Sequence, residues 1–303
     1  MGQIVALESY QAVPSVVQPD QLNRHSFDVS DTVANPSVRA LKSAVQSGIR
    51  FAHGLVGQRA LETRIALYFH QLEAEHWDEF RACVSYFKER SYRFVTPSEF
   101  LAASPSDHCL FLSFDDNFRS WHQALGILRD LAVTATFNVN TLPFRDVAPP
   151  AEVERYLRRL RHPLSRQTLS LEELKAIHAA GHTIGCHSHS HFVLSQLPRA
   201  LWDEEIASSR HCLEGILGVP VTDFSWPYGM RGHFSSELRS YCSGIGFKTL
   251  ANAIPGCQSI AGRDPLNIFR TGWRFDVPLE HNLTNLRING RLYAALTGRS
   301  VIG

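Results

Sequence analysis

The sequence predicts an α/β protein, a distorted (β/α) barrel that forms a single catalytic domain behind an N-terminal extension. Short apolar runs alternate with segments of helical spacing from about residue 64 onward, and repeated strand–helix units imply parallel strands. Polar residues suited to catalysis follow the ends of these runs, where the active face of an α/β barrel lies. A length of 303 residues suits one such barrel with an extension.

Residues 1–60 form the predicted extension, and residues 61–303 form the predicted domain. The first 35 residues are polar and aperiodic, which is typical of a partly disordered segment. Asn35-Pro36 then resembles a helix start, and apolar residues at helical spacing predict a helix over 38–49.

In the first half of the domain, each strand is predicted from a β-branched or aromatic run, and each helix from apolar residues on one face. Thr96 and Glu99 have the spacing of a capping box, which predicts a helix start at Pro97. The predicted strands and helices are, in order, strand 65–69, helix 77–87, strand 92–95, a helix from 97, strand 109–114, helix 121–131 and strand 133–139.

Residues 142–169 interrupt this alternation because they are rich in Pro and Arg, and we expect a loop with a short helix near 151–160. A second capping box, from Ser170 to Glu173, opens the next helix, and Gly181 ends it. The remaining predicted elements are strand 183–186, helix 199–217, strand 224–226, helix 234–243 and strand 247–251.

Composition and charge narrow the functional classes. The formal net charge is +1, so the chain lacks the excess of basic residues that nucleic acids or anionic membranes attract. No apolar stretch approaches the length of a membrane span, and the N-terminus shows no signal peptide. Six scattered cysteines suggest free thiols and a reducing compartment. We therefore expect a cytoplasmic protein, and the sequence makes no prediction of its oligomeric state.

Two adjacent carboxylates, Asp115 and Asp116, follow the run 109–114. Neighbouring strand residues point to opposite faces, but a turn at the strand end can bring both into one pocket. Two carboxylates there repel each other unless a cation lies between them, so the pair indicates a metal site. The alternative is that they only cap the helix that begins near residue 119.

Three histidines, His187, His189 and His191, follow the later apolar run 183–186. Imidazoles opposite a carboxylate pair supply a two-histidine, one-carboxylate metal site with a spare carboxylate as base. His187 and His189 share a face if the strand continues, whereas His187 and His191 converge if it turns at Ser188. Spacing alone leaves both pairings open, and a solvated polar loop is the alternative to any metal site.

Pro227-Tyr228-Gly229 follows a short apolar run and predicts a tight turn. Such a turn can present the Tyr228 backbone N–H to a developing oxyanion. The alternative is an ordinary strand-to-helix turn in which Tyr228 only packs.

From about residue 64 to 275 the chain resembles the polysaccharide deacetylase family, whose members share the NodB-homology domain. Ser113-Phe114-Asp115-Asp116 is similar to the family's Thr-Phe-Asp-Asp motif, and His187-Ser188-His189-Ser190-His191 to its His-Ser/Thr-x-x-His motif. Pro227-Tyr228-Gly229 matches a third motif in part. The resemblance implies a barrel of the polysaccharide deacetylase type with a divalent metal, usually zinc. Nickel, cobalt or iron also suit this ligand set.

Carried over by position, the resemblance makes Asp116, His187 and His191 the metal ligands and Asp115 the general base. His189 then lies behind the ligands or at the surface. Tyr228 supplies the oxyanion contact.

Two positions depart from the family pattern. The third motif often begins with an arginine that orients the base, and here that position is Ser225. We expect Arg270, at the end of a late strand, to replace it, with Arg231 as the alternative. The family's Leu-x-His motif supplies the general acid, and Leu279-Glu280-His281 is the late match, so His281 is the predicted acid. The alternatives are that the acid comes from elsewhere, such as His70 at the end of the first strand, or that it is absent.

The resemblance thus implies a metal-dependent hydrolase that removes an acetyl or other acyl group from the amide nitrogen of an amino sugar, in a glycan or a glycan precursor. The expected partner is this N-acetylated carbohydrate substrate. A deformylase or small-molecule amidohydrolase on the same fold is one alternative. A non-catalytic glycan-binding relative is the other.

Overall fold

The computed structural model of the chain describes residues 60–255 and 264–287. The predicted helix over 38–49 and all of the predicted extension except Ala60 lie outside these residues, so that boundary stays a prediction. Among the described residues, no helix combines the length and the apolar character that crossing a membrane requires.

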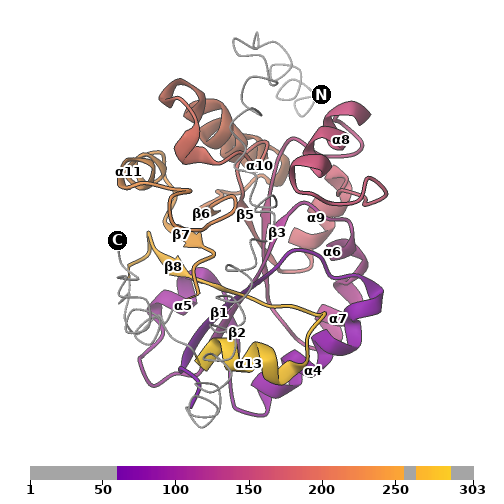
Figure 1. The fold of residues 1–303 in the computed structure, drawn as a ribbon, viewed down its shortest axis with the longest axis vertical. Coiled ribbons are helices and arrows are strands. Elements are labelled where there is room, and N and C mark those ends of the chain that lie inside the picture. The colour runs from indigo at the N-terminus through magenta and orange to yellow at the C-terminus, as the bar shows by residue number, and fades with distance from the viewer. Residues whose placement is uncertain (1–59, 256–263, 288–303) are drawn as a thin grey trace, which may run out of the picture. The chain divides into compact units, whose positions relative to one another are not determined.

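A parallel sheet of nine strands organises the domain (Figure 1). It follows the order β8-β7-β6-β5-β4-β3-β1-β9, while β2 pairs with the first half of β3. The strands are β1 Arg64–Phe69, β2 Arg93–Val95, β3 Cys109–Asp116, β4 Thr136–Val139, β5 Thr183–Cys186, β6 Asp223–Ser225, β7 Thr249–Asn252, β8 Ile268–Phe269 and β9 Thr271–Gly272.

One short segment, residues 268–272, supplies both ends of this sheet. Ile268 and Phe269 pair with β7, whereas Thr271 and Gly272 pair with β1. Only Arg270 lies between these two pairings, so the sheet curls into a nearly closed barrel. The predicted (β/α) barrel is confirmed.

Helices follow most strands and lie around the outside of the sheet (Figure 1). The α-helices are α4 Trp77–Lys88, α5 Pro97–Ala102, α6 Ser120–Gln123, α7 Leu125–Asp130, α8 Pro150–Arg159, α9 Leu171–Ala179, α10 Ser209–Leu217, α11 Ser236–Gly244 and α13 Leu279–Arg287. Short 3-10 turns span Ala74–His76, Leu194–Gln196 and Arg199–Leu201, and a π-helix, η6, spans Asp203–Ser208. Both predicted capping boxes are present, at the starts of α5 and α9.

A row of phenylalanines fixes which way the central strands face. Phe69, Phe114 and Phe137 are register partners on β1, β3 and β4. Their rings stack, with centroids 5.3 Å apart for the first pair and 5.0 Å for the second. Phe114 also contacts Phe80 of α4 and Trp121 of α6, so the row faces the helices. Because side chains alternate along a strand, the residues on either side of Phe114 face the barrel interior.

The structure differs from the predicted elements in three places. The predicted helix 121–131 is divided at Ala124 into α6 and α7. The predicted helix 199–217 begins as a 3-10 turn and a π-helix and becomes α-helical only at Ser209. The segment after residue 275 forms α13, which the sequence analysis left unassigned.

Candidate active site

Asp115 and Asp116 end β3 and point toward the same pocket for different reasons. Asp115 follows Phe114, so the alternation of the strand turns it into the barrel. Asp116 has a φ of 88°, in the left-handed region that non-glycine residues rarely adopt. This turn reverses the alternation and returns the second carboxylate to the interior. Both side chains are almost fully buried.

The histidine segment turns in the same way. Ser188 and His191 have φ values of 67° and 63°. With Asp116 and Tyr228, they make up four of the seven non-glycine residues of positive φ in the described part of the chain. Such strained backbone persists where surrounding structure holds it in place, and it concentrates at functional sites. The turn at Ser188 brings His187 and His191, rather than His187 and His189, to one pocket.

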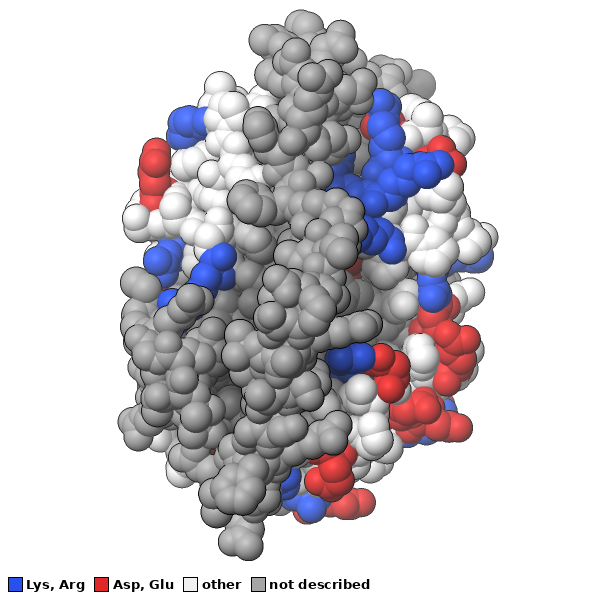
Figure 2. Space-filling view, in the orientation of Figure 1, with Lys and Arg blue, Asp and Glu red and all other residues white. Residues whose placement is uncertain are grey.

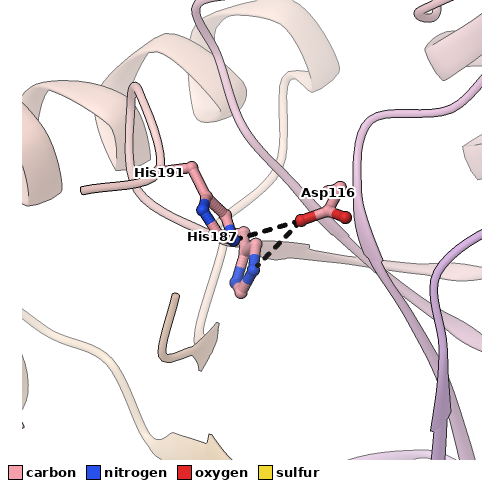
Figure 3. Close-up of side chains that lie close together, drawn as sticks. All are labelled: Asp116, His187 and His191. Atoms are coloured by element: carbon pink, nitrogen blue, oxygen red, sulfur yellow. Dashed lines mark ion pairs between the residues drawn. The ribbon is translucent and has the colours of Figure 1, made fainter. Parts of the chain in front are cut away.

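Asp116, His187 and His191 can hold one metal ion. Their ligand atoms all lie within 4.8 Å of one another (Figure 3). Asp116 Oδ1 is 3.6 Å from His187 Nε2 and 3.2 Å from His191 Nε2. Two ligands about 2.0–2.1 Å from a tetrahedral ion lie about 3.3–3.4 Å apart, so these separations fit a shared ion. Asp116 Oδ1 is also buried without a hydrogen-bond partner among the described residues, as expected of an atom whose partner is a metal.

The protonation states of His187 and Asp116 suit the binding of a cation. His187 Nδ1 lies 2.8 Å from the Ser225 carbonyl oxygen, so it carries the proton and leaves Nε2 free to ligate. Burial lowers the pKa of His187 to about 4, so the ring is neutral at neutral pH. Burial raises the pKa of Asp116, but His191 and the other nearby imidazoles lower it below its usual value. The site therefore presents a neutral His187 imidazole and an ionised Asp116 carboxylate.

Two elements hold the loop that carries His191. The main-chain N–H and the hydroxyl of Ser190 both donate to the Glu205 carboxylate, with N to Oε2 at 3.0 Å. The Glu205 carbonyl, in the π-helix, accepts the His189 N–H at 2.8 Å. From the other side, Arg159 donates to the Ser190 carbonyl. Arg159 ends α8, over which Figure 2 shows Lys and Arg side chains gathered.

Asp115 is held by three side chains from three other strand ends. The Arg270 guanidinium donates from Nη1 to Oδ1 at 2.8 Å and from Nη2 to Oδ2 at 2.7 Å. Asn138 donates to Oδ1 at 2.8 Å, and the Ser225 hydroxyl to Oδ2 at 3.1 Å. Burial raises the pKa of Asp115, but Arg270, His187 and Asn138 together hold it well below its usual range. Asp115 is therefore an oriented, ionised carboxylate beside the three candidate metal ligands.

Tyr228 borders the candidate metal ligands from the turn after β6. Its ring centroid lies 4.6 Å from that of His191, and its φ is 60°. Gly229 is needed here because a Cβ would lie 2.6 Å from the Ala253 backbone nitrogen. The turn is thus tightly packed against β7, which fixes Tyr228 beside His191.

Of the other residues predicted from the sequence, some lie at the site and some do not. Arg231 is exposed, and Arg270 is the arginine that contacts Asp115. His189 Nδ1 lies 2.9 Å from the Thr141 hydroxyl, behind the ligands. His281 is exposed on α13. The reason is local: residues 279–287 form a helix that packs on α4 rather than a strand end.

His70, the alternative acid, follows β1 directly. Because Phe69 is the register partner of Phe114, His70 lies at the level of Asp115. Its charge lowers the pKa of the buried Asp116, so the two groups interact.

Two residues of this region are not predicted from the sequence. Asn138 was read as part of a strand, although a buried amide in an otherwise apolar run is itself a signal of a partner. His162 lies in the segment after α8, where burial lowers its pKa and the nearby Asp116 carboxylate raises it. No local pattern marks His162, because its segment carries neither strand nor helix periodicity.

Comparison with known proteins agrees with this geometry. Residues 102–250 match the family model for polysaccharide deacetylase. Residues 102–250 therefore form a polysaccharide deacetylase domain. The match includes Asp115, Asp116, His187, His191 and Tyr228, and it ends before Arg270 and His281. A comparison of the sequence with curated proteins gave no match.

Solved structures share the polysaccharide deacetylase fold. IcaB from Ammonifex degensii aligns with a TM-score of 0.59 and 19% identity, over 76% of this chain and 98% of that one. The deacetylase PplD of Streptococcus pyogenes, solved in complex with acetate, aligns with a TM-score of 0.57 and 18% identity, over 74% of this chain and 97% of that one. At these identities the likeness concerns the fold.

Proposed function

We propose that this protein is a metal-dependent carbohydrate N-deacetylase, which hydrolyses the amide of an N-acetylated amino sugar. One observation carries the proposal: a buried two-histidine, one-carboxylate site lies next to a second carboxylate that an arginine keeps ionised. Metal-assisted hydrolysis needs both parts, a ligand set and a base. The family match and the deacetylase neighbours favour an amino-sugar amide as the substrate.

The metal ligands are Asp116, His187 and His191, and zinc is the ion this donor set favours. When bound, such an ion supplies a Lewis acid for the amide carbonyl and lowers the pKa of a bound water. His187 keeps its ligating tautomer through the Ser225 carbonyl.

The other residues have complementary tasks. Asp115 accepts the proton of the attacking water, and Arg270 with Asn138 fixes the direction of its oxygens. The Tyr228 backbone N–H donates to the oxyanion that develops on the acyl carbon. We propose that His70, rather than His281, donates the proton to the leaving amine. His70 directly follows β1, the strand beside β3, and it is exposed to solvent, from which it can regain a proton.

The experiment that tests the proposal measures acetate release from N-acetylated chito-oligosaccharides by the zinc-loaded protein. A chelator should abolish release, and added zinc should restore it. Asp115→Asn is the matched variant because it keeps the shape of the side chain and the three metal ligands. It should lose about 10²–10⁴-fold in kcat, as general base catalysis predicts, and retain zinc.

Two outcomes would contradict the proposal: full release after the metal has been removed, or full activity of Asp115→Asn. Release of formate from N-formylated substrates without acetate release would instead support the deformylase alternative. Zinc and sugar binding without turnover would support the non-catalytic glycan-binding alternative.

A further inference from the structure

Asn140 is a buried residue that joins the two segments that carry the candidate metal ligands. It directly follows β4, the strand that pairs with β3 on one side and with β5 on the other. β3 ends at Asp116, and His187 directly follows β5. Asn140 therefore lies between the two strand ends that carry the ligands, and it is fully shielded from solvent.

The main chain and the side-chain amide of Asn140 bind both of these segments. Its main-chain N–H donates to the Asp116 carbonyl at 3.0 Å. Its Nδ2 donates to the carbonyls of His187 and Ser188, the latter at 3.3 Å. Its own carbonyl accepts from Asn117 Nδ2 at 2.8 Å. Hydrogen bonds to one residue therefore connect the carboxylate segment to the histidine segment.

The side-chain amide of Asn140 has a defined orientation. Main-chain carbonyls can only accept hydrogen bonds, so Nδ2 must face those of His187 and Ser188. Oδ1 then faces α8, where the Tyr156 hydroxyl donates to it at 2.9 Å. Burial raises the pKa of Tyr156 well above its usual value, so the hydroxyl keeps the proton that it donates. Tyr156 is fully buried as well, so bulk water does not compete for this hydrogen bond.

The partners of Asn140 include two of the backbone turns that aim the ligands. Asp116 and Ser188 have φ values of 88° and 67°. Left-handed backbone is unfavourable for residues other than glycine, and it persists only where the surrounding structure holds it. The carbonyls of Asp116 and Ser188 both accept hydrogen bonds from Asn140. Asn140 therefore contacts both strained turns.

These contacts differ in position from those of Glu205 and Arg159. Glu205 and Arg159 bind residues 189 and 190, beyond the turn, whereas Asn140 binds residues 187 and 188, where the chain changes direction. Arg159 and Tyr156 both belong to α8. The segment that interrupts the alternation of strands and helices therefore holds the histidine segment through this helix.

We propose that Asn140, with its amide fixed by Tyr156, is a positioning residue that keeps the three candidate ligands converged in the metal-free protein. A site that is ordered in advance loses less conformational entropy on binding, so it binds its ion more tightly. The inference rests on the metal site of the proposed function, and it assigns no chemical step to Asn140 or Tyr156.

The test measures zinc affinity by titration and hydrogen exchange of the metal-free protein. Asn140→Leu keeps the branching of the side chain and removes its amide. It should weaken zinc binding about 10–100-fold, as is typical when a group that orients metal ligands is lost. Tyr156→Phe removes one hydroxyl and should weaken zinc binding about three- to tenfold. In both variants the amides of His189 and His191 should exchange faster than in the wild type, because the turn opens more often.

Two controls make the same changes away from the site. Asn282, on α13, is a buried asparagine whose Nδ2 donates to the Arg274 carbonyl at 2.7 Å. Tyr92 is a buried tyrosine whose hydroxyl donates to the Glu62 carbonyl. Asn282→Leu and Tyr92→Phe should lower the melting temperature, but they should leave zinc affinity and the exchange of the histidine segment unchanged.

A purely structural role for Asn140 would give the pattern of the controls. The melting temperature would fall, while the folded variants would bind zinc as tightly as the wild type, and this result would overturn the inference. If Asn140→Leu does not fold, Tyr156→Phe decides, because the loss of one hydroxyl leaves the packing of the ring in place. Wild-type zinc affinity in Tyr156→Phe would then overturn the inference.

The inference and the deacetylase function fail separately. If both variants bind zinc like the wild type and the wild type releases acetate, the function stands and the inference falls. If both variants weaken zinc binding but the wild type releases no acetate, the inference stands and the deacetylase function falls. If the wild type binds no zinc, the metal-dependent function falls and hydrogen exchange decides on Asn140: faster exchange in both variants supports the inference, and unchanged exchange overturns it.

Discussion

Arg270 and Asp115, 155 positions apart in the chain, form a two-bond ion pair in the barrel interior, at 2.8 and 2.7 Å. Arg270 is the residue between β8 and β9, so the segment that closes the barrel also orients the proposed base. Its Nε donates to the Asn252 carbonyl at 3.0 Å, and Nη1 also donates to the Ser113 hydroxyl at 2.8 Å. With both partners buried, neither charge has water as an alternative partner, so each depends on the other.

Arg270→Met should therefore impair both catalysis and stability. Without the guanidinium the pKa of Asp115 rises, because burial then acts unopposed by its main counter-charge. The acidic limb of the pH–kcat/KM profile should move to higher pH, and kcat at pH 7 should fall about 10²-fold or more. The free energy of unfolding should drop by about 3–5 kcal/mol, as for other broken buried pairs.

Arg270→Lys serves as the comparison because it keeps the charge and loses the two-bond geometry. It should leave the acidic limb closer to its wild-type position while still reducing kcat. A pH profile of Arg270→Met that coincides with that of the wild type would exclude an orienting role for Arg270.

His187→Ala and His191→Ala should each abolish tight zinc binding, since a structure with one imidazole and one carboxylate offers only two of the three ligands. Metal analysis of the purified variants after dialysis gives the stoichiometry directly. His189→Ala is the matched control from the same loop, and it should keep stoichiometric zinc because its ring contacts Thr141. Full metal content in His191→Ala would refute the proposed ligand set.

The barrel, the carboxylate pair and the histidine segment were accessible from sequence because each belongs to a local pattern. Apolar runs of four to eight residues predict strands, and the motif residues follow those strands directly. Arg270 could be suggested only from its place at the end of a late strand, because the strands on either side of it are two residues long and show no periodicity. Its partner is decided by how the sheet closes, which is a property of the whole chain.

At His281, a short motif and the periodicity of the surrounding residues predict different structures. A three-residue motif suggested an acid, yet Leu279, Leu283 and Leu286 recur at helical spacing and indicate the helix that forms. Asp116 and His191 needed left-handed backbone to reach the site, and no sequence rule assigns that conformation to Asp or His with certainty.

Gly185→Ala should disturb the base without touching a ligand. A Cβ at Gly185 would lie 2.2 Å from Asn138 Oδ1, and Asn138 donates to Asp115 at 2.8 Å. The amide must move, and Asp115 loses one of its fixed contacts. We expect kcat to fall about tenfold or more, because small misplacements of a catalytic group are costly, while zinc affinity is retained.

Gly215→Ala is the control for this substitution. Its added Cβ meets no atom within 4 Å, and Gly215 lies within α10, so the change should leave kcat unchanged and raise stability by about 0.5–1 kcal/mol. If Gly185→Ala has the same kinetics as Gly215→Ala, the contact between Asn138 and Asp115 contributes nothing to the rate.

Glu173→Gln should lower stability in a pH-dependent way. The Glu173 carboxylate caps α9 through the Ser170 N–H at 3.1 Å, accepts from Arg119 Nε at 2.9 Å and pairs with Arg145. Burial raises its pKa, but these hydrogen bonds and charges outweigh burial and lower the pKa to about 2. Glutamine still accepts the capping hydrogen bond, so the substitution isolates the contribution of the charge.

The sign of the effect follows from the lowered pKa. The ionised carboxylate contributes fully above the unfolded-state pKa of about 4.3, and its contribution is lost as the pH falls through about 2. Because both arginines are about one-third exposed, we expect about 1–2 kcal/mol at pH 7 after solvent screening. Urea denaturation of wild type and variant at pH 7 and near pH 2.5 measures the difference in the free energy of unfolding, which should shrink at the lower pH.

Glu172→Gln is the control. It breaks an exposed pair with Lys175 and should change the free energy of unfolding by less than about 0.5 kcal/mol at either pH. A difference for Glu173→Gln that is the same at both pH values would show that the carboxylate stabilises the fold by shape rather than by charge.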